Sequence, residues 1–159
     1  YEDHKFIRPL EKFIRRIEEE KIPLLGICFG HQIIAQALGG KVEKFSGGWS
    51  VGLKEYKWGN ESIHLNAWHQ DQIVKKPKKA KVLAENSFCK FAALSYGETI
   101  LTVQPHPEFT HEVIKGLIDT RGKGRVPEQL LDEALNSFEK KTSLNEIVAK
   151  FSSVLNGAR

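Results

Sequence analysis

The sequence predicts an α/β domain with a layered, mostly parallel sheet and helices on both faces. Three observations lead to this fold class. Residues 5–20 have the spacing of an amphipathic helix, and residues 24–27 form a short apolar run typical of a strand buried on both faces. Strand-like pieces then follow, and helical patterns return after Phe109. The chain has 159 residues, the size of one domain, so residues 1–159 are treated as a single unit.

The first helix is predicted from apolar residues that recur at spacings of three and four, with charged residues between them. These residues are Phe6, Leu10, Phe13, Ile14 and Ile17. Pro23 separates this helix from the buried strand. A second helix is expected over residues 31–38, ending at Gly39-Gly40.

Short strands are expected through the middle of the chain, because β-like segments alternate there with turn formers such as Gly59-Asn60 and Gly97. The segments are 41–45, 49–57, 62–66, 81–85, 90–95 and 99–104. The helical pattern after Phe109 comes from three apolar stripes. They are Val113, Ile114, Leu117 and Ile118; Leu130, Leu131 and Leu135; and Ile147, Val148, Phe151 and Leu155.

The start of the sequence suggests that more of the domain lies upstream. A buried parallel strand needs a neighbour on each side, yet only one helix precedes residues 24–27. The chain also contains no methionine. We therefore expect one or two N-terminal βα units, about 30 residues or more, to be missing from this sequence.

Composition excludes several classes of function. The net charge is +4, and five lysines lie between residues 75 and 81. These lysines flank a proline without interleaved arginines or aromatics, which favours a solvated turn over a nucleic-acid site. The apolar runs are too short to span a membrane, and no segment of the sequence indicates secretion, so we do not expect it. Two cysteines give no disulfide framework, so we expect a cytoplasmic protein.

Cys28 is the candidate nucleophile. It lies in Gly26-Ile27-Cys28-Phe29-Gly30, where a strand turns sharply into a helix, and the two glycines are expected to remove Cβ clashes at this elbow. The N–H groups at the helix start favour a thiolate and can bind the oxyanion of a tetrahedral intermediate, with Phe29 supplying the first. The alternative is a buried structural cysteine beside a tight turn.

His106 is the candidate base. It lies in Pro105-His106-Pro107-Glu108-Phe109, directly after an apolar strand, and the two prolines restrict the loop. Glu108 can accept a hydrogen bond from the imidazole and so fix its tautomer, which gives a Cys-His-Glu triad with Cys28. Alternatively, His106 is a loop histidine and Glu108 an acidic residue at a helix start.

These two segments resemble the class I glutamine amidotransferases, and the stand-alone, GMP synthase-like subgroup most closely. Further segments occur in the same order: Gly39-Gly40-Lys41-Val42, Gly48 to Gly52, Trp68 to Gln72 and Ser87-Phe88-Cys89. The resemblance covers essentially the whole chain. It implies a flavodoxin-like amidotransferase fold, the triad Cys28, His106 and Glu108, and no cofactor.

The resemblance also implies substrate contacts. Gln32, one helical turn after the nucleophile, would contact glutamine. His69 and Asp71 lie in a segment like the loop that closes over the substrate, although Gln70 stands where the family often has glycine. In the family a second oxyanion donor comes from an upstream glycine loop that this sequence lacks. A metal site at His69, Asp71 and His64 is not expected, because a strand places His64 and His69 on opposite faces.

The expected reaction is hydrolysis of the γ-amide of glutamine through a γ-glutamyl thioester, releasing glutamate and ammonia, which a partner synthase would accept. Two alternatives remain open. A γ-glutamyl peptidase would use the same triad on a larger leaving group. A partner-dependent, non-catalytic regulatory subunit would leave the triad idle.

Overall fold

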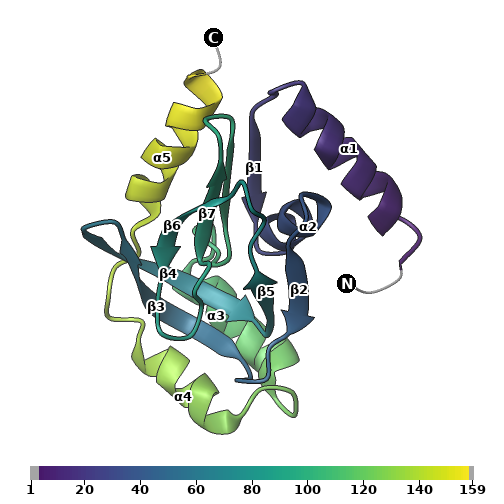
Figure 1. Ribbon diagram of the computed structural model, residues 1–159. Helices are drawn as coiled ribbons and strands as arrows, with labels where there is room; N and C mark the ends of the chain where they lie inside the picture. The colour runs from purple at the N-terminus through teal and green to yellow at the C-terminus, as the bar shows by residue number, and fades with distance from the viewer. Residues whose placement is uncertain (1–3, 158–159) are drawn as a thin grey trace.

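The computed structural model describes residues 4–157 and contains helices and strands in the order expected for an α/β domain (Figure 1). The helices are α1 (Ile7–Glu19), α2 (Phe29–Ala37), α3 (His111–Leu117), α4 (Glu128–Asn136) and α5 (Leu144–Asn156), with one π-helical turn at Ile118–Gly122. The strands are β1 (Leu24–Ile27), β2 (Lys41–Lys44), β3 (Ser50–Trp58), β4 (Glu61–His69), β5 (Asp71–Lys75), β6 (Lys81–Glu85), β7 (Ala93–Tyr96) and β8 (Ile100–Val103).

The main sheet is mixed, so the prediction of a mostly parallel sheet is wrong for the described residues. Its strand order is β1-β8-β7-β6-β3-β4, and only β1 and β8 run parallel. The cause is connection length. Turns of a few residues join β3 to β4 and β7 to β8, and such turns return the chain antiparallel, whereas β1 reaches β8 only after a long crossover.

A separate two-stranded ribbon contains β5, a strand absent from the predicted set. It pairs antiparallel with β2 through contacts such as Val42 with Ile73. Only Gln70 separates β4 from β5, so Trp68 to Gln72 forms strand ends and a tight turn instead of an open loop. The only apolar residues of β5, Ile73 and Val74, are adjacent, so the segment lacks the alternation that would predict a strand.

Helices cover both faces of the sheet, as predicted. In Figure 1, α1 and α2 lie on one side and α5 on the other. Ile100 of β8 packs in a core cluster with residues of α1 and α2, while Val103 packs in a second cluster with Ile147 of α5. A third cluster joins β3 to α3 and α4. None of the helices within residues 4–157 is long and apolar enough to cross a membrane.

The first helix buries a face slightly different from the predicted one. Ile7, Ile14 and Ile17 are buried, but Phe6 and Phe13 are 54% and 60% exposed. Residues 7, 14 and 17 are separated by seven and three positions, so they share one face of a helix of 3.6 residues per turn, and Phe6 and Phe13 fall beside it.

Candidate active site

The nucleophile candidate lies at a strained turn. Cys28 follows β1 directly, caps α2, and has φ 49° and ψ −103°. A positive φ is rare for a residue with a side chain, and within residues 4–157 only Lys21 and Cys28 adopt one outside glycine. A hydrogen bond of 2.9 Å from the Cys28 N–H to the Val103 carbonyl ties the turn to the end of β8.

The two elbow glycines differ. A Cβ on Gly26 would lie 2.9 Å from the carbonyl carbon of Gly30, and also too close to Ile34 and Thr102. A Cβ on Gly30 would meet no atom within 4 Å. The steric expectation therefore holds for Gly26 and is wrong for Gly30, because the first turn of α2 leaves the position of the Gly30 Cβ open.

The structure pairs His106 with Glu108, and Cys28 lies close enough to affect the imidazole. The His106 Nδ1 lies 2.7 Å from Glu108 Oε1. Burial disfavours the charged imidazole, but the neighbouring Cys28 and Glu108 side chains outweigh it and raise the pKa of His106 to about 9. Because Nδ1 is bonded to Glu108, Nε2 is the ring nitrogen that can interact with Cys28.

The His106 loop is held by Asn66 of β4, a residue that the sequence did not indicate. The His106 N–H donates to the Asn66 carbonyl at 2.8 Å, and the Asn66 amide Nδ2 donates to the Phe109 carbonyl at 2.8 Å. The Phe109 ring stacks on the imidazole with the ring centres 3.9 Å apart. Fully buried Asn66 therefore fixes both ends of the segment that positions the imidazole.

Gln104 is a second residue that the sequence analysis missed. Its amide Nε2 donates to Cys28 Sγ at 3.6 Å, and its side chain is fully buried. The signal was present in the topology: Ile27 pairs with Val103 across the parallel strands, so the next residues of both strands, Cys28 and Gln104, are neighbours. Only the pairing of β1 with β8 reveals it.

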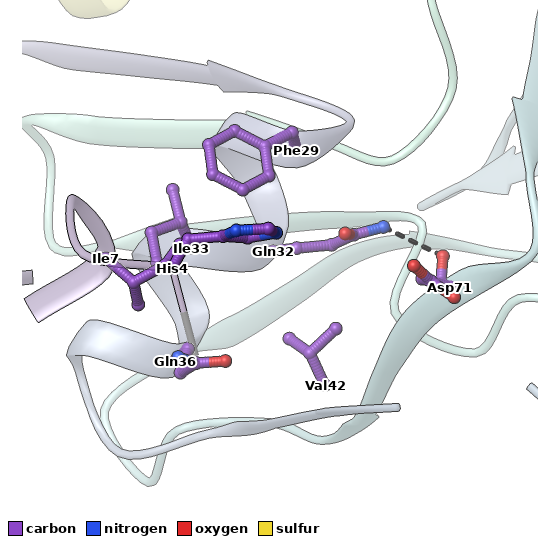
Figure 2. Close-up of a pocket in the computed structure, with 8 residues that line it drawn as sticks. All are labelled: His4, Ile7, Phe29, Gln32, Ile33, Gln36, Val42 and Asp71. Carbon is purple, nitrogen blue, oxygen red and sulfur yellow. Dashed lines mark hydrogen bonds between the residues drawn. The ribbon is translucent and has the colours of Figure 1, made fainter. Parts of the chain in front are cut away.

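The substrate candidates Gln32, His69 and Asp71 also converge, through the backbone of Asp71. The Gln32 Nε2 donates to the Asp71 carbonyl at 2.8 Å (Figure 2), and the His69 Nδ1 donates to the same oxygen at 3.2 Å. Burial lowers the pKa of His69 to about 4, so its ring is neutral at pH 7. With Nδ1 protonated, the buried Nε2 is a bare acceptor without a protein partner among the described residues.

A cavity of about 110 Å³ adjoins the elbow (Figure 2). It combines apolar and polar walls, with the Phe29 ring at one side and the Gln32 amide and Asp71 at another. The lining residues are His4, Ile7, Phe29, Gln32, Ile33, Gln36, Val42 and Asp71. Phe29 also begins α2, so its N–H has no acceptor within the helix and is available to a ligand.

His31 is close to this site in the sequence, but its contacts indicate a structural role. It is fully buried, and burial lowers its pKa to about 3. The neutral ring donates from Nε2 to the Phe91 carbonyl at 2.9 Å and accepts at Nδ1 from the Thr102 hydroxyl at 2.7 Å. These bonds lock α2 against β8. Among the described residues, no group of three His, Cys, Asp or Glu side chains is arranged to hold a metal ion.

Comparison with known proteins identifies the family. The family model described as glutamine amidotransferase class-I matches residues 3–118. The chain therefore belongs to the class I glutamine amidotransferase family.

Individual relatives are similar to this chain in sequence and carry names consistent with this family. A glutamine amidotransferase-like protein of Schizosaccharomyces pombe is 32% identical over 148 residues, covering 86% of this chain and 60% of that protein. Gamma-glutamyl peptidase 2 of Arabidopsis thaliana is 29% identical, covering 88% and 62%. A glutamine-hydrolyzing GMP synthase subunit of Pyrococcus furiosus is 35% identical, covering 64% and 58%. The chain thus spans less than two thirds of the length of these relatives.

A solved structure confirms the fold class. The glutamine amidotransferase of Methylobacillus flagellatus superposes with a TM-score of 0.76 at 16% identity, covering 98% of this chain and 69% of that one. At this identity, the likeness shows the fold alone.

Proposed function

We propose that this protein hydrolyses a γ-glutamyl amide bond with Cys28 as nucleophile, His106 as general base and acid, and Glu108 as the carboxylate that orients His106. The observation that carries the proposal is the 2.7 Å contact of His106 Nδ1 with Glu108 Oε1, and the raised pKa of His106, about 9, supports it, because Cys28 and Glu108 both act on the imidazole. At neutral pH the ring is then protonated and can give a proton to a leaving group.

The chemistry follows from the positions of these groups. The Cys28 thiolate attacks the γ-carbonyl carbon, and the Phe29 N–H at the start of α2 donates to the developing oxyanion. His106 Nε2–H then protonates the departing ammonia or amine, leaving a γ-glutamyl thioester on Cys28. Neutral His106 next takes a proton from water, the hydroxide attacks the thioester, and glutamate and the thiolate are released. Glu108 keeps Nδ1 protonated throughout.

The cavity beside Phe29 supports a place for the glutamyl group. The NH₂ group of Gln32 is already bonded to the Asp71 carbonyl and to Gln104, so the polar side of the cavity offers the Gln32 side-chain oxygen and the Asp71 carboxylate, two acceptors that suit an ammonium group. His69 acts less directly, because it does not line this cavity and instead bonds the Asp71 carbonyl. In this proposal it holds the turn between β4 and β5 that carries Asp71.

Glutamine is the proposed substrate, with ammonia as leaving group. A γ-glutamyl peptide is the second candidate, because gamma-glutamyl peptidases of Arabidopsis thaliana are among the relatives. Hydrolysis of glutamine and of a series of γ-glutamyl dipeptides, followed by glutamate release, distinguishes them. A higher kcat/KM for glutamine supports the first candidate, and a higher value for dipeptides supports the second.

We further propose that a synthase accepts the ammonia, since glutamine-hydrolyzing GMP synthase subunits are among the relatives. In the alternative of a partner-dependent regulatory subunit, the triad stays idle in the isolated chain. Labelling with a glutamine-like chloroketone, with and without a candidate synthase partner, tests this. Labelling of Cys28 in the isolated protein supports a competent enzyme. We also propose the cytoplasm as the location, because the reaction needs a free thiol.

Replacing the nucleophile tests the function directly. Cys28→Ala should lower glutamate release at least about a thousandfold, because the thioester cannot form. Cys89→Ala is the matched control. Cys89 is buried in the core, where burial raises its pKa to about 12, and it is not part of the triad. Wild-type activity in Cys28→Ala would refute the proposed function.

A further inference from the structure

Two side-chain amides, those of Gln32 and Gln104, connect a backbone carbonyl to the Cys28 sulfur. The Gln32 Nε2 donates to the Asp71 carbonyl at 2.8 Å and to Gln104 Oε1 at 3.1 Å. The Gln104 Nε2 in turn lies 3.6 Å from Cys28 Sγ. The triad does not use this chain of hydrogen bonds, and Gln104 lies at the opposite end of the loop from Glu108.

The direction of the chain follows from the Asp71 carbonyl. A carbonyl oxygen only accepts hydrogen bonds, so the end of the Gln32 amide that faces it must be the NH₂ group. The second hydrogen of this NH₂ group points to Gln104, which must therefore present its oxygen there. The NH₂ group of Gln104 is then the end that faces the sulfur. Reversing either amide would place two donors or two acceptors against each other.

The place of Gln104 in the fold keeps this donor aimed at the sulfur. Gln104 directly follows β8, and its backbone N–H donates to the Ala92 carbonyl at 2.8 Å. Its side chain is fully buried, so water does not compete for the amide. A preorganised donor in a dry site stabilises a negative charge more strongly than the same donor in water does.

We propose that Gln104 is a further catalytic residue, which donates a hydrogen bond to the Cys28 thiolate and is oriented for this by Gln32. This inference rests on the proposed function, in which Cys28 is the nucleophile. It assigns Gln32 a second task besides facing the cavity: Gln32 sets which end of the Gln104 amide meets the sulfur. A substrate that contacts Gln32 therefore also acts on the nucleophile.

The test measures the reactivity of Cys28 without any glutamyl substrate. The rate of alkylation by iodoacetamide is followed against pH, and mass spectrometry separates Cys28 from buried Cys89. The variants are Gln104→Met, which keeps the length but removes the donor, and Gln104→Glu, which turns an acceptor toward the sulfur. Gln32→Met removes only the orienting group. Gln72→Met is the matched control, because Gln72 is also buried but bonds the Phe88 carbonyl.

Gln104→Met should lower the alkylation rate at pH 7 about tenfold, the lower end for a hydrogen bond to a charged group, and shift the profile to higher pH. Gln104→Glu should lower the rate further. If Gln104 had only a structural role, Glu, which is closer to Gln in shape than Met is, would lower the rate less than Met does. Gln32→Met should shift the profile in the same direction, and Gln72→Met should leave it unchanged.

A Gln104→Met profile that superimposes on the wild-type profile overturns the inference. If circular dichroism shows that Gln104→Met is unfolded, the Gln32→Met variant is used instead, because it leaves Gln104 in place. A Gln32→Met profile that is not shifted then overturns the inference. These results are separate from the proposed function. The proposed function fails if Cys28→Ala retains activity. The inference on Gln104 fails if activity depends on Cys28 but the alkylation rate of Cys28 is the same with and without the Gln104 amide.

Discussion

The two glycines that flank the nucleophile offer a sharp test of how the elbow is packed. A Cβ on Gly26 would approach the Ile34 Cδ1 at 2.7 Å, and the carbonyl carbon of Gly30 and the Thr102 Cγ2 at 2.9 Å each. Ile34 can rotate away, but the other two cannot. The Gly30 atom belongs to the backbone of α2, and Thr102 is tied to His31 by a 2.7 Å hydrogen bond. The strand and the helix must therefore move apart.

We expect Gly26→Ala to lower the free energy of unfolding by about 2 kcal/mol, as overpacking of a tight core does. For a chain of this size, that is a fall in Tm of about 4–8 °C. Gly30→Ala should leave Tm unchanged or raise it by about 2–4 °C, because its Cβ enters open space in a helix and alanine is the better helix former. Thermal melts followed by circular dichroism measure both. Equal Tm values for the two variants would refute this account of the elbow.

Three further predictions concern His106. Asn66→Asp keeps the volume of the side chain but removes the donor to the Phe109 carbonyl. We therefore expect kcat to fall about tenfold or more, with little change in KM. An unchanged kcat in the folded variant would exclude a positioning role for Asn66. Because the pKa of His106 is raised to about 9, kcat should fall as pH rises through about 9, where the ring can no longer protonate the leaving group. Glu108→Gln removes one of the contacts that raise this pKa, so the alkaline limb should move to lower pH, and a limb that stays in place would contradict the pairing.

The raised pKa of His106, to which Cys28 and Glu108 both contribute, also predicts the sign of a stability effect. The folded pKa of about 9 lies above the ordinary value of 6.5. The stabilisation from the charged ring is therefore fully present below about pH 6.5 and is lost as pH rises through about 9.

Local sequence determined the class of the fold and the places of most elements. The period of apolar residues marks α1 and α5, and a short apolar run marks β1. The direction of the strands did not follow, because apolar runs look alike in parallel and antiparallel strands. Direction depends on which strands pair, and in this chain short turns make most pairs antiparallel.

Within the site, sequence alone indicated the residues whose local pattern is unusual. Cys28 lies between glycines and His106 between prolines, and Glu108 is close enough in sequence to reach the imidazole. Asn66 and Gln104 have no such pattern. Gln104 meets Cys28 across 76 positions because β1 and β8 are in register, and Asn66 meets the His106 loop because β4 forms a bridge with it. Such contacts exist only after distant segments pair, so tertiary structure alone decided them.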